Sequence, residues 1–223
     1  MKTPIATAFG SFGYGWQQLW KYFLHLFLIA VILLVLNTPV MPGPFGDEGP
    51  FHSGGFVVFN LFIAAYSLLV LPIIKYGGDW LYLRYMRDEN PNIADIFAGF
   101  KKGYLNVVLA NLLVFAICGI GFVLFIVPGL IFACRLSFVS YLVMDKGLDP
   151  VAAIEKSWNM TRGHGWRIFG MYLLGIPLVL CGFFLVIVGA LFALMWIGTA
   201  FASLYHAVDL EDQARLNQNG ATA

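Results

Sequence analysis

The feature that most constrains this chain is its long apolar runs, the last of which covers residues 166–208. One helix needs about 20 apolar residues to cross the hydrocarbon core of a bilayer, so this block is long enough for two crossings. The composition agrees, because 60% of the 223 residues are hydrophobic and only 11% are charged. Soluble domains carry about 25% charged residues. The sequence therefore predicts an all-α, polytopic integral membrane protein.

The apolar runs divide into six expected transmembrane helices, which polar segments and glycine turns separate. Gly119 and Gly121 are expected to form one tight turn and Gly182 another. Three amphipathic or aromatic segments precede the hairpins and are expected to lie at the membrane surface. The predicted spans are about residues 20–37, 56–76, 104–118, 122–144, 166–181 and 184–208, and the predicted interfacial helices are about residues 3–18, 93–102 and 150–161.

Residues 1–223 are thus predicted to form one membrane domain of three parallel helical hairpins. Helix is expected to continue from the second span through residues 80–84, with kinks at Pro72 and at Gly77-Gly78. Pro150 is expected in the first turn of the third interfacial helix, with Asp149 as its N-cap.

Basic residues fall almost entirely on one side of this layout. Of the 13 lysines and arginines, twelve lie in segments that share a side with the N-terminus, and the segments on the other side have none. Positive charge is enriched on the cytoplasmic side of membrane proteins, so both termini are expected to be cytoplasmic. The remaining basic residue, Arg135, falls within the fourth span, and the six predicted spans contain no aspartate or glutamate.

Several functional classes are not expected, because the sequence lacks the features that they require. A net charge of +1 gives no electrostatic case for a nucleic-acid partner. The histidines are scattered and the cysteines lie in apolar runs, so no metal site, disulfide framework or cofactor is expected. No nucleophile–base arrangement is visible, and we do not expect an enzyme. These residues are His25, His52, His164 and His206, with Cys118, Cys134 and Cys181.

Arg135 is the most informative candidate for a lipid or anion contact. A charge at its expected depth costs about 2.5–3.5 kcal/mol on insertion scales, and such residues usually face a protein interior or a wet cavity. The alternative is a snorkelling arginine, or one bonded to carbonyls freed near Pro128-Gly129. Arg84, Lys101 and Arg167 are further candidate contacts with lipid headgroups.

These three residues belong to a basic rim that is expected at the inner membrane surface. The alternative to headgroup binding is that the rim residues only set the membrane topology. Interleaved acidic residues are expected to form local ion pairs with the rim. The basic residues are Lys75, Arg84, Arg87, Lys101, Lys102, Lys156, Arg162 and Arg167, and the acidic ones are Asp79, Asp88, Glu89, Asp95 and Glu155. On the other side, Asp47 and Glu48 lie in a Pro- and Gly-rich loop that is either a plain connector or a partner-docking loop.

Three stretches in order carry a family resemblance over roughly residues 56–210. They are marked by Pro72-x4-Gly77, Leu83-Arg84 and Asp95-Ile96-Phe97-x-Gly99-Phe100-Lys101; by Ile126-Val127-Pro128-Gly129-Leu130 and Arg135-Leu136-Ser137-Phe138; and by Ser157-Trp158, Thr161, Gly163 and Trp166-Arg167-x-Phe169. The chain resembles bacterial membrane proteins grouped with YciC-like proteins and with the membrane domain of glycerophosphoryl diester phosphodiesterases. The resemblance implies six helices in the bacterial cytoplasmic (inner) membrane. The phosphodiesterase activity is not carried over, because the chain lacks room for that domain and its acidic and histidine residues.

Two functional hypotheses follow from these features. The first is a non-enzymatic accessory subunit, anchor or assembly factor of a membrane complex, with the lipid bilayer and other membrane subunits as partners. The alternative is a transporter or lipid-handling protein with an anion or headgroup site near Arg135. Helices broken at Pro72 and Pro128 motivate the second hypothesis, because broken helices often line intramembrane sites.

Overall fold

The computed structural model describes residues 8–37, 55–89, 91–101, 103–184 and 186–220, and every regular element in these ranges is helical. The elements are α1 (Ala8–Lys21), α2 (Phe23–Asn37), α3 (Gly55–Leu69), α4 (Leu71–Met86), the 3-10 helix η1 (Ile93–Phe97), α5 (Ala98–Lys101), α6 (Tyr104–Leu124), α7 (Ile126–Arg135), α8 (Val139–Lys146), α9 (Pro150–Met160), α10 (Gly165–Phe184) and α11 (Val186–Gly220).

Four helical segments are long and apolar enough to cross a membrane: Asn60–Met86, Tyr104–Leu124, Ile126–Lys146 and Leu191–Arg215. A fifth is possible if α1 and α2, which meet at an angle of 103°, form one broken span. The apolar segment Gly165–Leu180 is shorter than this test requires. The predicted class of helical membrane protein is therefore supported, while the arrangement of six spans in three hairpins stays a prediction.

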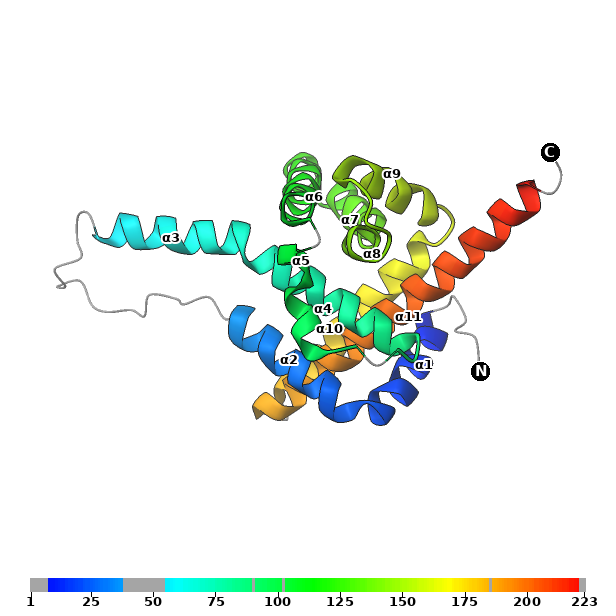
Figure 1. Ribbon diagram of the computed structural model, residues 1–223, viewed down its shortest axis with the longest axis horizontal. Coiled ribbons are helices and arrows are strands. Elements are labelled where there is room, and N and C mark those ends of the chain that lie inside the picture. The colour runs from blue at the N-terminus through cyan, green and yellow to red at the C-terminus, as the bar shows by residue number, and fades with distance from the viewer. Residues whose placement is uncertain (1–7, 38–54, 90, 102, 185, 221–223) are drawn as a thin grey trace.

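Helix α4 is the centre of the fold and packs against α2, α3, α6, α8, α11 and η1 (Figure 1). It begins after a break at Val70, with Pro72 in its first turn, where a missing N–H removes no helix hydrogen bond. The expected break at Pro72 is therefore present. The helix also continues through residues 80–84 as predicted, and Leu81 and Leu83 are fully buried.

Helix α4 runs through Gly77 and Gly78 without interruption, and a kink there stays a prediction. They are close-packing positions. A Cβ on Gly77 would lie 1.9 Å from the carbonyl oxygen of Ile96, and one on Gly78 would lie 2.8 Å from a methyl group of Leu33. These glycines thus allow η1 and α2 to approach the α4 backbone.

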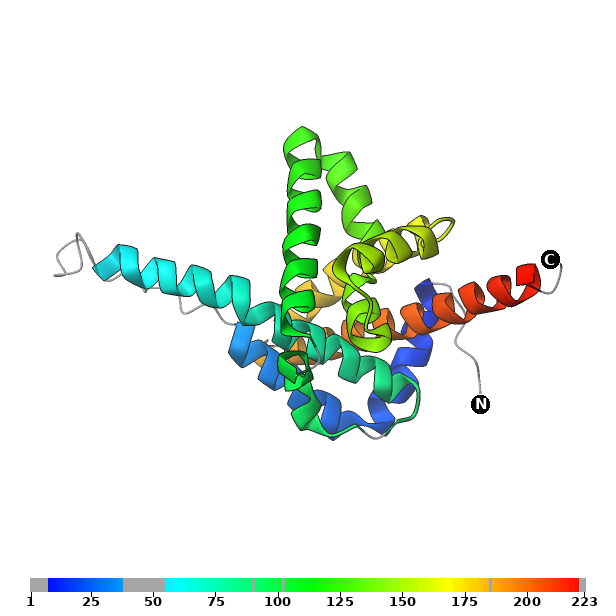
Figure 2. The same ribbon diagram turned by 45° about the horizontal axis from the view of Figure 1, so that its top comes forward.

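The predicted turn at Gly119 and Gly121 is wrong. Helix α6 continues past both glycines to Leu124, and the chain reverses at Phe125, whose backbone is extended. A Cβ on Gly121 would lie 2.9 Å from the Cα of Gly129, so Gly121 and Gly129 allow α6 and α7 to pack closely next to the turn. Figure 2 shows this hairpin standing out from the rest of the molecule.

The predicted fourth, fifth and sixth spans also have different limits in the structure. Residues 136–138 interrupt the fourth span between α7 and α8, and α10 continues through Gly182 to Phe184. Helix α11 has 35 residues and extends beyond residue 208. In its polar end, Asp209 and Asp212 pair with Lys146 on α8 and Lys156 on α9.

Three lead-in segments are helical, as the sequence predicts. Helix α1 packs along α11, where the indole N–H of Trp196 donates to the carbonyl of Phe12 at 3.0 Å. The second lead-in is η1 with α5, and α9 is the third. Pro150 begins α9 after Asp149, as predicted, although the Asp149 side chain makes no capping hydrogen bond.

Candidate binding cavity in the helix bundle

Charged side chains join helices that are far apart in sequence, and we call this set the ion-pair network. It connects α1 with the end of α4, α4 with α8, and α8, α9 and α10 with α11. Its pairs are Lys21–Asp88, Arg84–Glu89, Arg84–Asp95, Arg87–Asp145, Lys146–Asp209, Lys156–Asp212, His164–Glu211 and Arg167–Glu211. Arg84 of the predicted rim pairs with Glu89 and Asp95, as expected, whereas Asp88 pairs with Lys21 on α1 and not with a rim residue.

Arg87 and Asp145 form a bidentate ion pair within the network. Two guanidinium nitrogens donate to the two carboxylate oxygens at 2.6 and 2.9 Å, and the hydroxyl of Tyr205 donates to the same carboxylate at 3.4 Å. A two-pronged pair of this kind fixes orientation as well as distance. It holds α4, α8 and α11 together at one end of the bundle.

A second part of the network fixes α1 to the end of α4. The ammonium of Lys21 donates to Asp88 at 2.6 Å, and the amide of Gln18 donates to the same oxygen at 3.2 Å. The hydrogen bond from Lys21, followed by the one from Gln18, lowers the pKa of the Asp88 carboxyl. Asp88 has a backbone φ of 58°, which few residues other than glycine adopt.

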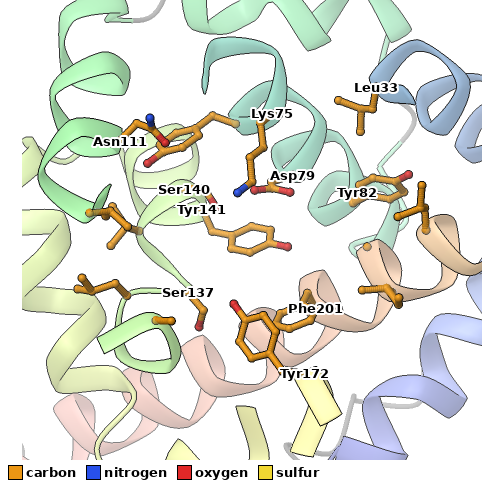
Figure 3. A pocket seen from close by; sticks show the side chains of 18 of the residues that line it. Leu33, Lys75, Asp79, Tyr82, Asn111, Ser137, Ser140, Tyr141, Tyr172 and Phe201 are labelled. Carbon is orange, nitrogen blue, oxygen red and sulfur yellow. The ribbon is translucent and has the colours of Figure 1, made fainter. Parts of the chain in front are cut away.

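A cavity of about 670 Å³ lies between α2, α4, α6, α8, α10 and α11 (Figure 3). Only Lys75 and Asp79 among its lining residues are charged, and they are one helical turn apart on α4. The polar lining residues are Asn111, Ser137, Ser140, Tyr76, Tyr82, Tyr141 and Tyr172. The remaining walls are mainly aliphatic and include Leu33, Leu34, Val114, Leu194 and Ile197. The cavity therefore combines a small charged and hydroxyl-rich region with apolar walls.

The cavity adjoins the ion-pair network along the helices. On α4, Asp79 precedes Arg84 by five residues and Arg87 by eight, which is about 8 and 12 Å at the helical rise. On α11, Phe201 lines the cavity and precedes Tyr205 by four residues, or about 6 Å, and the ring of the cavity residue Tyr141 stacks on the Tyr205 ring at 4.8 Å. Both cavity charges also fall within the candidate span Asn60–Met86.

Lys75 and Asp79 therefore line the cavity, and their placement in the rim at the membrane surface stays a prediction. The predicted second span ended near residue 76 because hydropathy falls there, so the next charges were placed at the membrane surface. In the structure α4 continues, and Asp79 turns toward Ser140 and Lys75 inside the cavity. Asp79 lies beyond the predicted second span but within the candidate span Asn60–Met86.

Arg135 lies at the end of α7 and faces α9 instead of this cavity. Its guanidinium donates to the carbonyl of Trp158 at 3.5 Å and lies 5.2 Å from the centroid of the Trp158 ring. Its own carbonyl accepts a hydrogen bond from the Ser157 hydroxyl at 2.8 Å. The contacts favour the alternative in which Arg135 binds carbonyl groups, although these belong to α9 and not to the backbone near Pro128-Gly129.

The other candidate contacts lie on different helices, and no contact within the described residues joins them. Arg84 is held by Glu89 and Asp95 at 2.7 and 2.8 Å. Arg167 on α10 lies 3.9 Å from Glu211, and Lys101 is exposed at the end of α5. The candidate partner residues Asp47 and Glu48 lie outside the described residues.

In the part of the chain that the structure describes, no group of three or more histidine, cysteine, aspartate or glutamate side chains is placed to hold a metal ion. Comparisons with protein-family models, with curated proteins and with solved structures find no match to this chain. The family resemblance seen in the sequence motifs therefore stays a prediction, and the argument for function depends on the cavity itself.

Proposed function

We propose that this protein is a non-enzymatic membrane protein that binds an amphiphilic molecule, such as a lipid, in the cavity at Lys75 and Asp79. The observation that carries the proposal is the placement of two charges in a cavity of about 670 Å³ within a candidate membrane span. This moves the lipid-handling hypothesis from Arg135 to the centre of the bundle.

The energetics of charged groups in membranes support this proposal. A lysine or aspartate at the centre of a membrane helix costs about 2.5–3.5 kcal/mol on insertion scales, and residues of this kind usually mark binding sites or pathways. Ligand cavities typically measure about 300–1,000 Å³ and combine apolar walls with a few polar groups. The cavity fits both descriptions, and its two kinds of lining match the two parts of an amphiphile.

The broken helix before the charged residues is a second argument. Regular helix is interrupted only at Val70, whose backbone stays in the right-handed helical region, and Lys75 follows this interruption by little more than one turn. Helix breaks at membrane depth are tolerated where they line protein cavities, and they commonly border binding sites. The break at Pro72 thus supports a site beside it.

We also propose six spans with both termini on the cytoplasmic side of the bacterial cytoplasmic membrane. The charge distribution of the sequence supports this topology. The turn between α6 and α7 adds support, since Val123, Phe125 and Ile126 are 75–88% exposed and no charged residue lies there. On this topology the ion-pair network faces the cytoplasm.

A cavity-filling substitution tests the binding function. Ala133 lines the cavity, whereas Ala116 is exposed on α6, so Ala133→Trp and Ala116→Trp form a matched pair. Both proteins are purified in mild detergent, and their bound lipids are counted by native mass spectrometry. We expect Ala133→Trp to lose its bound lipid and Ala116→Trp to retain it. Equal lipid occupancy in two well-folded variants would contradict the proposed function.

An accessory subunit remains the second candidate, and helix α3 favours it. This helix extends away from the rest of the molecule (Figure 1), and Val58, Leu61 and Phe62 on it are 69–71% exposed. Another membrane protein is the partner this hypothesis requires. Leu61→Ala combined with Phe62→Ala should abolish co-purification of that partner, whereas Phe115→Ala on α6 should not. If the wild-type protein always purifies without a second protein, the accessory-subunit hypothesis is contradicted.

A further inference from the structure

The two charges of the cavity lie outside the ion-pair network. The ion-pair network joins its members at 3.9 Å or less, but neither Lys75 nor Asp79 has an ion-pair partner within 4.0 Å among the described residues. Side chains four residues apart on a helix have Cβ atoms about 5–6 Å apart. The cavity therefore presents one positive and one negative group side by side.

The surroundings of Asp79 suit an amine with N–H groups. Its carboxylate lies beside Ser140, whose side chain is buried, and four tyrosines line the same cavity. Carboxylate and hydroxyl oxygens accept hydrogen bonds, and a primary ammonium offers three donors. Aromatic rings also attract cations. A quaternary ammonium has no N–H donor and makes only the ring and charge interactions.

The surroundings of Lys75 suit an anionic oxygen. Its side chain is exposed at the cavity, and an ammonium is a strong point charge for phosphate. A ligand that is only anionic would place negative charge close to Asp79, which is unfavourable in a membrane interior. A ligand that is only cationic would meet Lys75 in the same way. The pair therefore selects for a molecule that carries both charges.

We infer that the cavity is selective for a zwitterionic headgroup that joins a primary amine to a phosphate, as in an ethanolamine phospholipid. The phosphate lies at Lys75, the ammonium lies at Asp79, and the apolar walls formed by Leu33, Val114 and Ile197 receive the start of the acyl chains. This inference rests on the proposed lipid-binding function and names its ligand class.

The test uses nanodiscs that contain equal amounts of dioleoyl phosphatidylethanolamine, phosphatidylglycerol and phosphatidylcholine. Lipids that remain bound to the full chain after extraction are identified by native mass spectrometry. We expect the wild-type protein to retain the ethanolamine lipid over each of the others by about tenfold, the effect of one hydrogen bond to a charged group. Equal retention of the three lipids would overturn the inference.

Two substitutions test the roles of the individual charges. Asp79→Asn should remove the preference for ethanolamine and favour the glycerol lipid, because only the positive charge remains. Lys75→Gln should weaken retention of all three phosphate lipids. Lys101→Gln, an exposed lysine on α5, is the matched control and should leave the preference unchanged. If Asp79→Asn does not fold, Lys75→Gln alone still decides, since unchanged lipid retention in that variant contradicts the inference.

A competition experiment distinguishes a lipid from a soluble ligand with the same chemistry. Free O-phosphoethanolamine should displace little ethanolamine lipid, because it does not use the apolar walls. Efficient displacement would mean that the headgroup alone supplies affinity, and it would support the charge selectivity but contradict the lipid tail. If Ala133→Trp loses lipid but the wild type shows no headgroup preference, the binding function stands and this inference fails.

Discussion

Gly77 controls how closely η1 can approach α4. A Cβ at this position would lie 1.9 Å from the backbone oxygen of Ile96 and 2.7 Å from its carbonyl carbon, and backbone atoms cannot move aside as a side chain can. Asp79, which lines the cavity, lies two residues later on the same helix. One missing side chain therefore determines a backbone contact close to the candidate site.

We expect Gly77→Ala to destabilise the protein by about 1–3 kcal/mol or more, the usual effect of overpacking. The intrinsic preference of Ala for helix, about 1 kcal/mol, does not offset this clash. Gly119→Ala is the control, because Gly119 also lies within a helix and a Cβ there meets nothing within 4 Å. Thermal unfolding in detergent, followed by tryptophan fluorescence, should show a lower Tm for Gly77→Ala alone. Equal Tm values would contradict the η1 packing.

Helix α11 illustrates how burial changes the value of an ion pair. Asp209 pairs with Lys146 and has 3% of its side chain exposed, and Gln213 donates to its second oxygen at 2.8 Å. Asp212 pairs with Lys156 but has 23% of its side chain exposed. Breaking a buried pair costs about 3–5 kcal/mol, because a charge remains without a partner, whereas exposed pairs contribute about 0–1 kcal/mol.

Asp209→Asn and Asp212→Asn therefore form a matched test of how α11 is held. The first should lower the Tm clearly, since it leaves Lys146 unpaired, and the second should change it little. Lys146 is 28% exposed, so the loss for Asp209→Asn should fall below the upper end of that range. Limited proteolysis should also cleave the end of α11 faster in Asp209→Asn. Equal sensitivity of the two variants would mean that the Asp209 pair does not hold the helix.

The elements show which parts of the fold follow from local sequence. Hydropathy predicts apolar helices, and the prolines at positions 72 and 150 mark helix starts because a first turn tolerates them. Gly77, Gly119 and Gly121 look alike in sequence, yet each lies inside a continuous helix. A glycine that allows close packing cannot be separated from one that makes a turn without its neighbours in space.

The cavity was missed for a related reason. Hydropathy falls at Lys75 and Asp79, which is equally consistent with the end of a span and with a charged patch on a continuing helix. The choice depends on Ser140 and Tyr172, which reach the same cavity from α8 and α10. The spacing of Lys75 and Asp79, one turn apart on α4, was the only local signal in the sequence that a site lies there.

The described part of the chain combines the ion-pair network at one end of α4 with apolar helices that extend away from the bundle, as Figures 1 and 2 show for α3 and the α6–α7 hairpin. The first and the last described helices both contribute to this network, α1 through Lys21 and α11 through Asp212. A membrane protein orients its basic side toward the cytoplasm. The arrangement supports the proposed topology and gives it a direct test.

Single cysteines at three positions report which segments cross the membrane. In a chain whose native cysteines are replaced by serine, Ser53→Cys lies between the first two predicted spans, Glu155→Cys lies on α9, and Asn217→Cys lies near the end of α11. A membrane-impermeant maleimide added to intact cells should label only position 53, and positions 155 and 217 should react only after permeabilisation. Because α1 and α2 meet at 103°, α2 must make the first crossing with 15 residues, about 22 Å of helix. If position 53 is also protected in intact cells, α2 does not cross, the six-span topology is wrong, and the molecule has fewer spans than proposed.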